Sequence, residues 1–137
     1  MTRIAVVICT LNRQESCLRT LRSLAQQTVD DFAVCVVDNG GTDGTAAAVQ
    51  AYAADFPVPL DACVEPTPGL SAARNRGARE CLQAAGAADA ELDEGDLALV
   101  FLDDDVIAVP GLIEAYRKAF SDPEVAAAGG KIVPKVP

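Results

Sequence analysis

The sequence contains no histidine and no tryptophan, and its aromatic residues are only four Phe and two Tyr. The absence of His excludes Ser-His and Cys-His catalytic pairs and every metal site that needs an imidazole ligand. With so few aromatic side chains, the core has to be built from Ala, Val, Leu and Ile, which suits helices packed on a parallel sheet. The 137 residues are enough for one domain with its own hydrophobic core.

The chain also has no C-x-x-C pair, and its five cysteines stand far apart in the sequence. Cys9 and Cys35 lie inside apolar runs, where a free cysteine behaves as a small buried hydrophobe. An odd number of widely spaced cysteines predicts reduced thiols, a cytoplasmic location and no disulfide framework. For a longer full-length protein, a place at the membrane periphery stays open.

Positive charge and long apolar segments are missing as well. The net charge of −9 argues against binding to nucleic acid or to an anionic membrane, and an anionic ligand would need a bridging metal or a local group of arginines. No stretch approaches the roughly 18 apolar residues that span a bilayer, and the apolar run over 4–9 is too short for a signal peptide. We therefore expect a soluble chain with no membrane span.

Short apolar runs alternate with segments of helical periodicity. The runs predict strands over 4–9, 32–37, 62–64, 97–102 and, interrupted by two glycines, 125–133. Four helices are expected. The first runs to Gln27 with Asn12 as its N-cap, the second follows the turn at 39–44, the third runs to about residue 85 with Ser71 as its N-cap, and the fourth runs from Pro110 to Phe120. Residues 86–96 predict a solvated connection. This alternation predicts an α/β fold, a Rossmann-like and mostly parallel sheet with helices on both faces in three α/β/α layers.

Three consecutive carboxylates, Asp103, Asp104 and Asp105, follow the apolar run over 97–102. Such a run predicts a strand buried on both faces, and open α/β sheets bind their ligands outside the carboxyl ends of the strands. On an extended backbone Asp103 and Asp105 point to one side, with Asp104 turned away or toward a second group. Carboxylates suit Mg²⁺ or Mn²⁺. A solvated acidic turn is the alternative, but the position of the three carboxylates directly after a buried strand argues against such a turn.

Other polar residues are expected at the same edge of the sheet. Asp38 follows the second strand, where its carboxylate either accepts from a ring N–H or sugar hydroxyl or caps the adjacent turn; both roles stay open. Arg74, Arg76 and Arg79 lie on the helix that begins nearby and offer one or two positive charges to an anionic ligand. A solvated basic face is the alternative, favoured for Arg79 and, after it, for Arg76. A metal-bridged diphosphate is the simplest ligand, since each bare carboxylate ~5 Å from a phosphate costs about 3 kcal/mol at an effective dielectric near 20.

Four segments, in this order and spacing, closely resemble the family 2 glycosyltransferases, which have the GT-A fold. They are VVICTLNR (6–13), QQTVDDFAVCVVDNGGTDGT (26–45), PGLSAARNRG (68–77) and FLDDDV (101–106). The resemblance covers nearly the whole chain and implies a hexosyltransferase-like enzyme. It also implies a nucleotide-diphosphosugar donor, a divalent metal, Mn²⁺ or Mg²⁺, and transfer with inversion to a saccharide, lipid or protein acceptor.

The resemblance further implies roles for individual residues. Asp38 would bind the base and Asp105 the metal, while Asp103 would lie near the ribose or the metal. The remaining residues expected to border the donor are Thr10, Asn12, Arg13, Arg74, Asn75 and Asp104.

The same resemblance implies that residues 1–137 form the nucleotide-sugar-binding part of a longer domain. The acceptor-binding half and the general base are expected beyond Pro137, so the isolated chain is expected to be inactive. Two alternatives stay open. One is a non-catalytic sugar-nucleotide-binding or assembly module of the same fold. The other is a sugar nucleotidyltransferase, which would normally have a glycine-rich loop after the first strand, whereas residues 9–13 contain no glycine.

Overall fold

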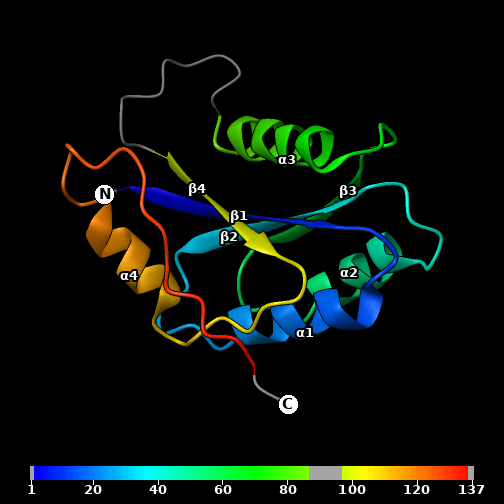
Figure 1. Cartoon of the computed structure of the whole chain (residues 1–137), viewed down its shortest axis with the longest axis horizontal. Coiled ribbons are helices and arrows are strands. Elements are labelled where there is room, and N and C mark those ends of the chain that lie inside the picture. The colour runs from blue at the N-terminus through cyan, green and yellow to red at the C-terminus, as the bar shows by residue number, and fades with distance from the viewer. Residues whose placement is uncertain (1, 87–96, 136–137) are drawn as a thin grey trace.

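The structure is a computed structural model and describes residues 2–86 and 97–135 (Figure 1). Within these two ranges, four parallel strands form one sheet in the order β3-β2-β1-β4. The strands are β1 (Arg3–Thr10), β2 (Phe32–Asp38), β3 (Leu60–Val64) and β4 (Leu97–Asp103). The helices are α1 (Gln14–Leu24), α2 (Thr45–Ala53), α3 (Leu70–Ala84) and α4 (Leu112–Ala119).

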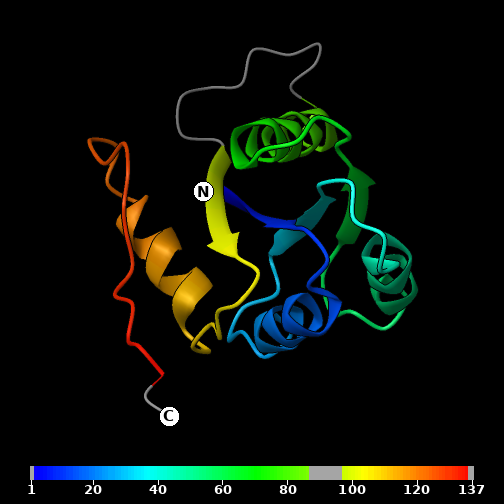
Figure 2. The same ribbon diagram turned by 45° about the vertical axis from the view of Figure 1, so that its right-hand side comes forward.

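The helices cover both faces of the sheet, which confirms the predicted three-layer α/β fold. Ile4, Val6 and Ile8 of β1 belong to a core cluster with α1, α2 and α4, whereas Ala5 and Val7 belong to a second cluster with α3. Successive side chains of a strand point to opposite faces, so a strand covered on both sides is apolar throughout. Among the described helices, Figure 2 shows α3 on one side of the sheet and α1 and α2 on the other. None of the described helices is long and apolar enough to cross a bilayer.

Two predictions about strands are wrong. Residues 125–133 form no strand; the described chain after α4 runs as irregular backbone, with Ile132 83% and Val133 73% exposed. Their short apolar runs, broken by two glycines, find no strand to pair with. The run over 97–102 does form β4, but the prediction that this strand is buried on both faces is wrong. β4 lies at the edge of the sheet, and Phe101 is 47% exposed. An apolar pattern indicates what a strand can bury, not whether a neighbour is present to cover it.

Both predicted helix caps are wrong as well. Arg13 occupies the N-cap position of α1, while Asn12 has a φ of +51° and accepts a hydrogen bond from the Thr42 N–H (2.7 Å). Gly69 precedes α3, so Ser71 lies inside the first helical turn. Pro110 precedes α4, and α1 ends at Leu24, before the predicted Gln27. The predictions assumed local capping, whereas here the first N–H of α1 donates to Asp43 of a distant loop (3.0 Å).

Gly77 lets α3 lie close to the sheet. A Cβ at this position would lie 2.3 Å from Val7 Cγ1 and 3.1 Å from Val37 Cγ2. We expect Gly77→Ala to lower the free energy of unfolding by about 1–3 kcal/mol through overpacking, although Ala is the better helix former. Urea denaturation measures this change. Gly111→Ala is the control, because nothing lies within 4 Å of its added Cβ, and an equal effect of both variants would contradict the explanation.

Candidate functional site

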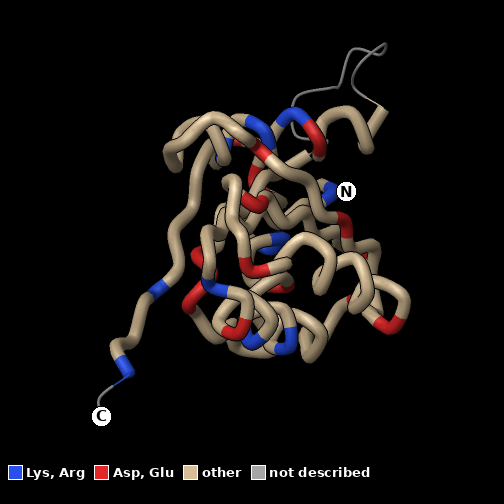
Figure 3. The backbone as a smooth tube through the Cα atoms, turned by 90° about the vertical axis from the view of Figure 1, so that its right-hand side faces the viewer, with Lys and Arg blue, Asp and Glu red and all other residues tan. Residues whose placement is uncertain are grey.

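The carboxyl ends of β1, β2 and β4 bring the predicted polar residues to one edge of the sheet. The strand register pairs Thr10 with Asp38 and Cys9 with Asp103. Thr10 and Asp104, 94 residues apart in sequence, are joined directly by a hydrogen bond. The convergence expected from parallel topology is therefore observed. Figure 3 looks toward this side of the molecule, where acidic and basic positions lie among one another.

Asp104 is the buried centre of this edge. Its side chain accepts a hydrogen bond from Thr10 Oγ1 (2.9 Å) and lies 3.3 Å from Arg13 Nη1, and the residue is only 6% exposed. The Ser16 hydroxyl donates to the Asp104 carbonyl (2.8 Å). Of the two orientations predicted for Asp104, the one toward a second group is therefore observed, with Thr10 and Arg13 as that group. Asp104 links β1 and the start of α1 to the end of β4.

Asp103 and Asp105 are both exposed, but they do not lie on one continuous extended strand, as the prediction that they point to one side had assumed. β4 ends at Asp103, and residues 104–105 form a turn, so the prediction of an extended backbone through Asp105 is wrong. Asp105 Oδ2 lies 3.3 Å from Arg13 Nη2, and both side chains are about half exposed (50% and 52%). Asp103 shares a shallow depression with Arg74. Each exposed carboxylate therefore has an arginine near it.

Asp38 caps the turn that follows β2. It is 4% exposed, and its Oδ1 accepts the Gly41 N–H at 2.8 Å. The turn-capping alternative is thus observed. A role for the second carboxylate oxygen toward a nucleobase stays a prediction. Asn12, through its hydrogen bond from the Thr42 N–H, ties this turn to the loop after β1.

Gly41 lies where the two loops touch. A Cβ there would lie 2.9 Å from Asp38 Oδ1 and 3.0 Å from Asn12 Oδ1. We expect Gly41→Ala to separate the loops and to weaken the binding of any ligand held by them, at a cost to stability of about 1–3 kcal/mol. Titration calorimetry and urea denaturation on the same variant test both effects. Wild-type behaviour in both would show that the loop contact has no role.

Two residues that support the site were missed by sequence reasoning. Asn39 donates to the carbonyls of Glu65 (2.9 Å) and Thr67 (2.8 Å) and accepts the Gly69 N–H (3.1 Å), so it fixes the loop before α3. Asp43 accepts hydrogen bonds from the Thr45 hydroxyl and the Gln14 N–H, and these bonds, that from Thr45 above all, lower the pKa of Asp43. The only signal was their place in a turn of residues that readily hydrogen-bond the backbone.

The three arginines of α3 have different surroundings. Arg76 pairs with Glu80 (2.7 Å) and Arg79 lies 3.9 Å from Glu65, so both serve the surface of the protein itself. Arg74 has no carboxylate within 4.0 Å among the described residues and lies beside Cys9 and Asp103. Burial raises the pKa of Cys9 to about 11, and the positive charge of Arg74 opposes this rise. Asn75 is exposed next to Arg74.

The donor atoms at this edge fit a hard cation that is completed by a ligand. Across residues 2–86 and 97–135, no group of three or more Cys, Asp and Glu side chains is arranged to hold a metal ion. Mg²⁺ and Mn²⁺ in phosphate sites, however, commonly take one or two carboxylates and obtain their other ligands from phosphate and water. Asp103 and Asp105 could provide those two carboxylates.

Comparison with known proteins identifies the family. The model of glycosyl transferase family 2 matches residues 5–136. The chain belongs to this family. Among curated family relatives, the uncharacterized glycosyltransferase YfnE of Bacillus subtilis is 31% identical over 123 residues, covering 89% of this chain and 28% of YfnE. The validoxylamine A glucosyltransferase of Streptomyces hygroscopicus subsp. jinggangensis is 34% identical over 122 residues, which cover 88% of this chain and 26% of that enzyme. The chain thus spans about a quarter of the length of these two relatives.

Solved structures of glycosyltransferases share the fold. The mannosyltransferase PcManGT from Pyrobaculum calidifontis, in complex with GDP-Man and Mn²⁺, superposes with a TM-score of 0.71 at 24% identity, over 89% of this chain and 33% of that one. S. aureus TarS in complex with UDP-GlcNAc gives a TM-score of 0.63 at 21% identity, over 98% of this chain and 37% of the TarS chain. The family 2 chain described here therefore has the GT-A fold.

Proposed function

We propose that this family 2 chain is the donor-binding part of an inverting glycosyltransferase, which binds a nucleotide-diphosphosugar together with Mn²⁺ or Mg²⁺. One observation carries the proposal. At the carboxyl edge of the sheet, the exposed carboxylates of Asp103 and Asp105 flank a buried Asp104 that Thr10 and Arg13 hold in place.

The nucleoside is proposed to lie against the two joined loops after β1 and β2. Thr10 is the last residue of β1, Asn12 and Arg13 lie in the loop that follows it, and Asp38 is the last residue of β2. One carboxylate oxygen of Asp38 is occupied by the Gly41 N–H, which leaves the other as the acceptor for a donor group of the base. A loop already fixed by internal hydrogen bonds loses little freedom when a ligand binds to it.

The diphosphate is proposed to lie between the acidic turn and the start of α3. Arg74, with Asn75 beside it, places a positive charge near Asp103, and Arg13 places one beside Asp104 and Asp105. Asp103 and Asp105 would hold the divalent ion. When bound, this ion neutralises the repulsion between carboxylates and phosphates and stabilises the departing diphosphate as a Lewis acid.

Transfer with inversion also needs a base that takes the proton of the acceptor hydroxyl. We propose that the residues of this chain provide the leaving-group side only. Asp38 is committed to the turn, Asp104 is held by Thr10 and Arg13, and Asp103 and Asp105 are proposed metal ligands. We therefore expect the chain by itself to bind the donor without transferring its sugar.

Isothermal titration calorimetry with UDP, GDP and dTDP, each with and without Mn²⁺, tests this function. We expect at least one diphosphate to bind, more tightly with Mn²⁺ than without it. Failure of all three to bind under both conditions would rule out the proposal. A nucleotidyltransferase would instead bind a nucleoside triphosphate and a sugar phosphate, so UTP, GTP and dTTP with glucose 1-phosphate form the comparison series. Turnover by a longer natural chain that includes this part would separate an enzyme from a non-catalytic binding module.

A further inference from the structure

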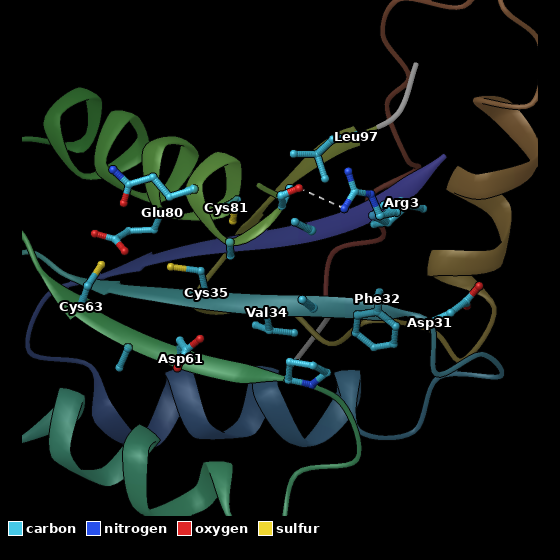
Figure 4. A pocket seen from close by; sticks show the side chains of 18 of the residues that line it. Arg3, Asp31, Phe32, Val34, Cys35, Asp61, Cys63, Glu80, Cys81 and Leu97 are labelled. Carbon is cyan, nitrogen blue, oxygen red and sulfur yellow. Dashed lines mark hydrogen bonds between the residues drawn. The ribbon is translucent and has the colours of Figure 1, made fainter. Parts of the chain in front are cut away.

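A second cavity lies on the α3 face of the sheet, away from the acidic turn. It has a volume of about 780 Å³, and its lining extends from Arg3 and Phe32 at the amino ends of the strands to three cysteines, Cys35, Cys63 and Cys81 (Figure 4). Of the described helices, α3 alone covers this face, and the Arg3 side chain donates to the Ala85 carbonyl just beyond the end of α3 (3.2 Å). The proposed donor site uses none of these residues.

The three thiols come from three different elements. Cys35 lies on β2, Cys63 on β3 and Cys81 on α3. The Cys35 thiol lies near both of the others, and each of them affects its pKa. The buried face of α3 consists of Ala73, Gly77 and Cys81. The side chains of these residues are small or absent, so the helix lies close to the sheet. Cys81 and Cys35 of β2 belong to the same buried cluster on this face.

The geometry favours one of the two possible pairs. β2 and β3 are parallel, and Cys35 is in register with Asp61, so Cys63 lies two residues further along its strand. With ~3.3 Å per residue along a strand and ~4.8 Å between strands, the Cα atoms of Cys35 and Cys63 are roughly 8 Å apart. A disulfide needs Cα atoms within about 7 Å of each other. The strand register imposes no such offset on Cys35 and Cys81, which lie on opposite sides of the helix–sheet interface in one buried cluster.

We propose that Cys81 and Cys35 form a thiol-disulfide exchange site, which a low-molecular-weight disulfide such as oxidised glutathione converts to a Cys35–Cys81 disulfide. The Cys81 thiolate attacks one sulfur of the reagent, forming a mixed disulfide and releasing one thiolate. The Cys35 thiol then loses its proton and attacks Cys81 Sγ, releasing the second reagent thiolate. Two protein thiols are oxidised to one disulfide, while one reagent disulfide is reduced to two thiols.

The surroundings of the thiols support this order of events. The thiolate is the reactive form of cysteine, and the neighbouring Cys35 thiol lowers the pKa of Cys81, although burial opposes it. Cys81 and burial raise the pKa of Cys35, which makes Cys35 the second thiol to react. Burial raises the pKa of Cys63 to about 12, and on the other face of the sheet it raises that of Cys17 to about 12. Cys81 is only 8% exposed, but it lines the cavity, which gives a small reagent its route to the sulfur.

Peptide mapping of the folded chain tests the proposal. The chain is incubated with oxidised glutathione, its remaining thiols are alkylated in denaturant at low pH, and it is digested with trypsin. No Lys or Arg lies between Arg22 and Arg74, so Cys35 and Cys63 share the peptide 23–74, while Cys81 lies in the peptide 80–117. We expect loss of two of the five thiols and a crosslinked pair of these two peptides. A disulfide within 23–74, glutathione adducts without any crosslink, or no loss of thiols would each overturn the proposal.

Cys63→Ser and Cys81→Ser form a matched pair of variants at the same cavity. The crosslink should persist in Cys63→Ser and disappear in Cys81→Ser, with circular dichroism to verify the fold. A crosslink lost in folded Cys63→Ser would contradict the assignment. The wild-type map decides the question even if one variant fails to fold.

Discussion

Replacing Asp38 by Asn should weaken nucleoside diphosphate binding roughly 10- to 150-fold, the range that corresponds to losing a hydrogen bond to a charged group. Asn retains an oxygen that can accept the Gly41 N–H, whose bond to Asp38 is 2.8 Å long. It replaces the second carboxylate oxygen, the proposed acceptor for the base, with an NH₂ donor. The substitution therefore preserves the turn and removes the contact to the ligand. Titration calorimetry measures the affinity, and thermal unfolding checks the fold.

Asp38→Ala is the matched variant, because it removes both interactions. We expect it to bind as weakly as Asp38→Asn and, in addition, to unfold at a lower temperature, because the partly buried Gly41 N–H loses its acceptor. If Asp38→Asn bound the diphosphate like the wild type and only Asp38→Ala were impaired, Asp38 would be a turn cap and not a ligand-binding residue.

Replacing Asp105 by Asn should abolish the gain in affinity that Mn²⁺ gives to a nucleoside diphosphate. The same change should leave binding without metal unchanged or improve it. A carboxylate ~5 Å from a phosphate is unfavourable by about 3 kcal/mol at an effective dielectric near 20, and the half-exposed position of Asp105 reduces this value. Loss of the carboxylate also frees Arg13, now 3.3 Å from it, to approach the phosphates. Calorimetry of both proteins, with and without Mn²⁺, gives the four affinities needed.

Asp55→Asn provides the control for the change in net charge, because Asp55 is exposed beyond the end of α2. It should retain the full effect of Mn²⁺. Equal enhancement by Mn²⁺ in wild type and Asp105→Asn would remove Asp105 from the proposed metal site, and uniformly weaker binding in both conditions would indicate a role in positioning alone.

The convergence of polar residues at one edge was predictable because it depends on topology. Runs of Val, Ile and Ala separated by helices require parallel strands, and parallel strands bring their carboxyl ends together. The hydrogen bond between Thr10 and Asp104 follows from this rule, although no local pattern relates the two residues. The placement of Asp38 and Asp103 followed in the same way.

The errors arose where a local pattern was interpreted without its tertiary partner. Asn12 has the side chain of a helix cap, but it accepts from Thr42 on another loop, and Asp43 reaches across to the first turn of α1 instead. The exposure of Phe101 and the absence of a strand over 125–133 depend on which neighbours are present, and composition alone does not determine that. Asn39 was missed because its three partners lie 26 to 30 residues away.

The most direct test of the metal-bridged diphosphate is paramagnetic line broadening in an ¹H–¹⁵N NMR spectrum of the chain. Substoichiometric Mn²⁺ is added together with the nucleoside diphosphate that binds most tightly, and Mg²⁺ provides the diamagnetic reference. A metal-bridged diphosphate at the acidic turn predicts that the amide signals of Asp103, Asp104 and Asp105 and of Thr10 to Arg13 broaden first, while those of Arg3 and Ala85 beside the second cavity stay sharp. Broadening that is centred elsewhere, or that does not depend on the nucleotide, would contradict it.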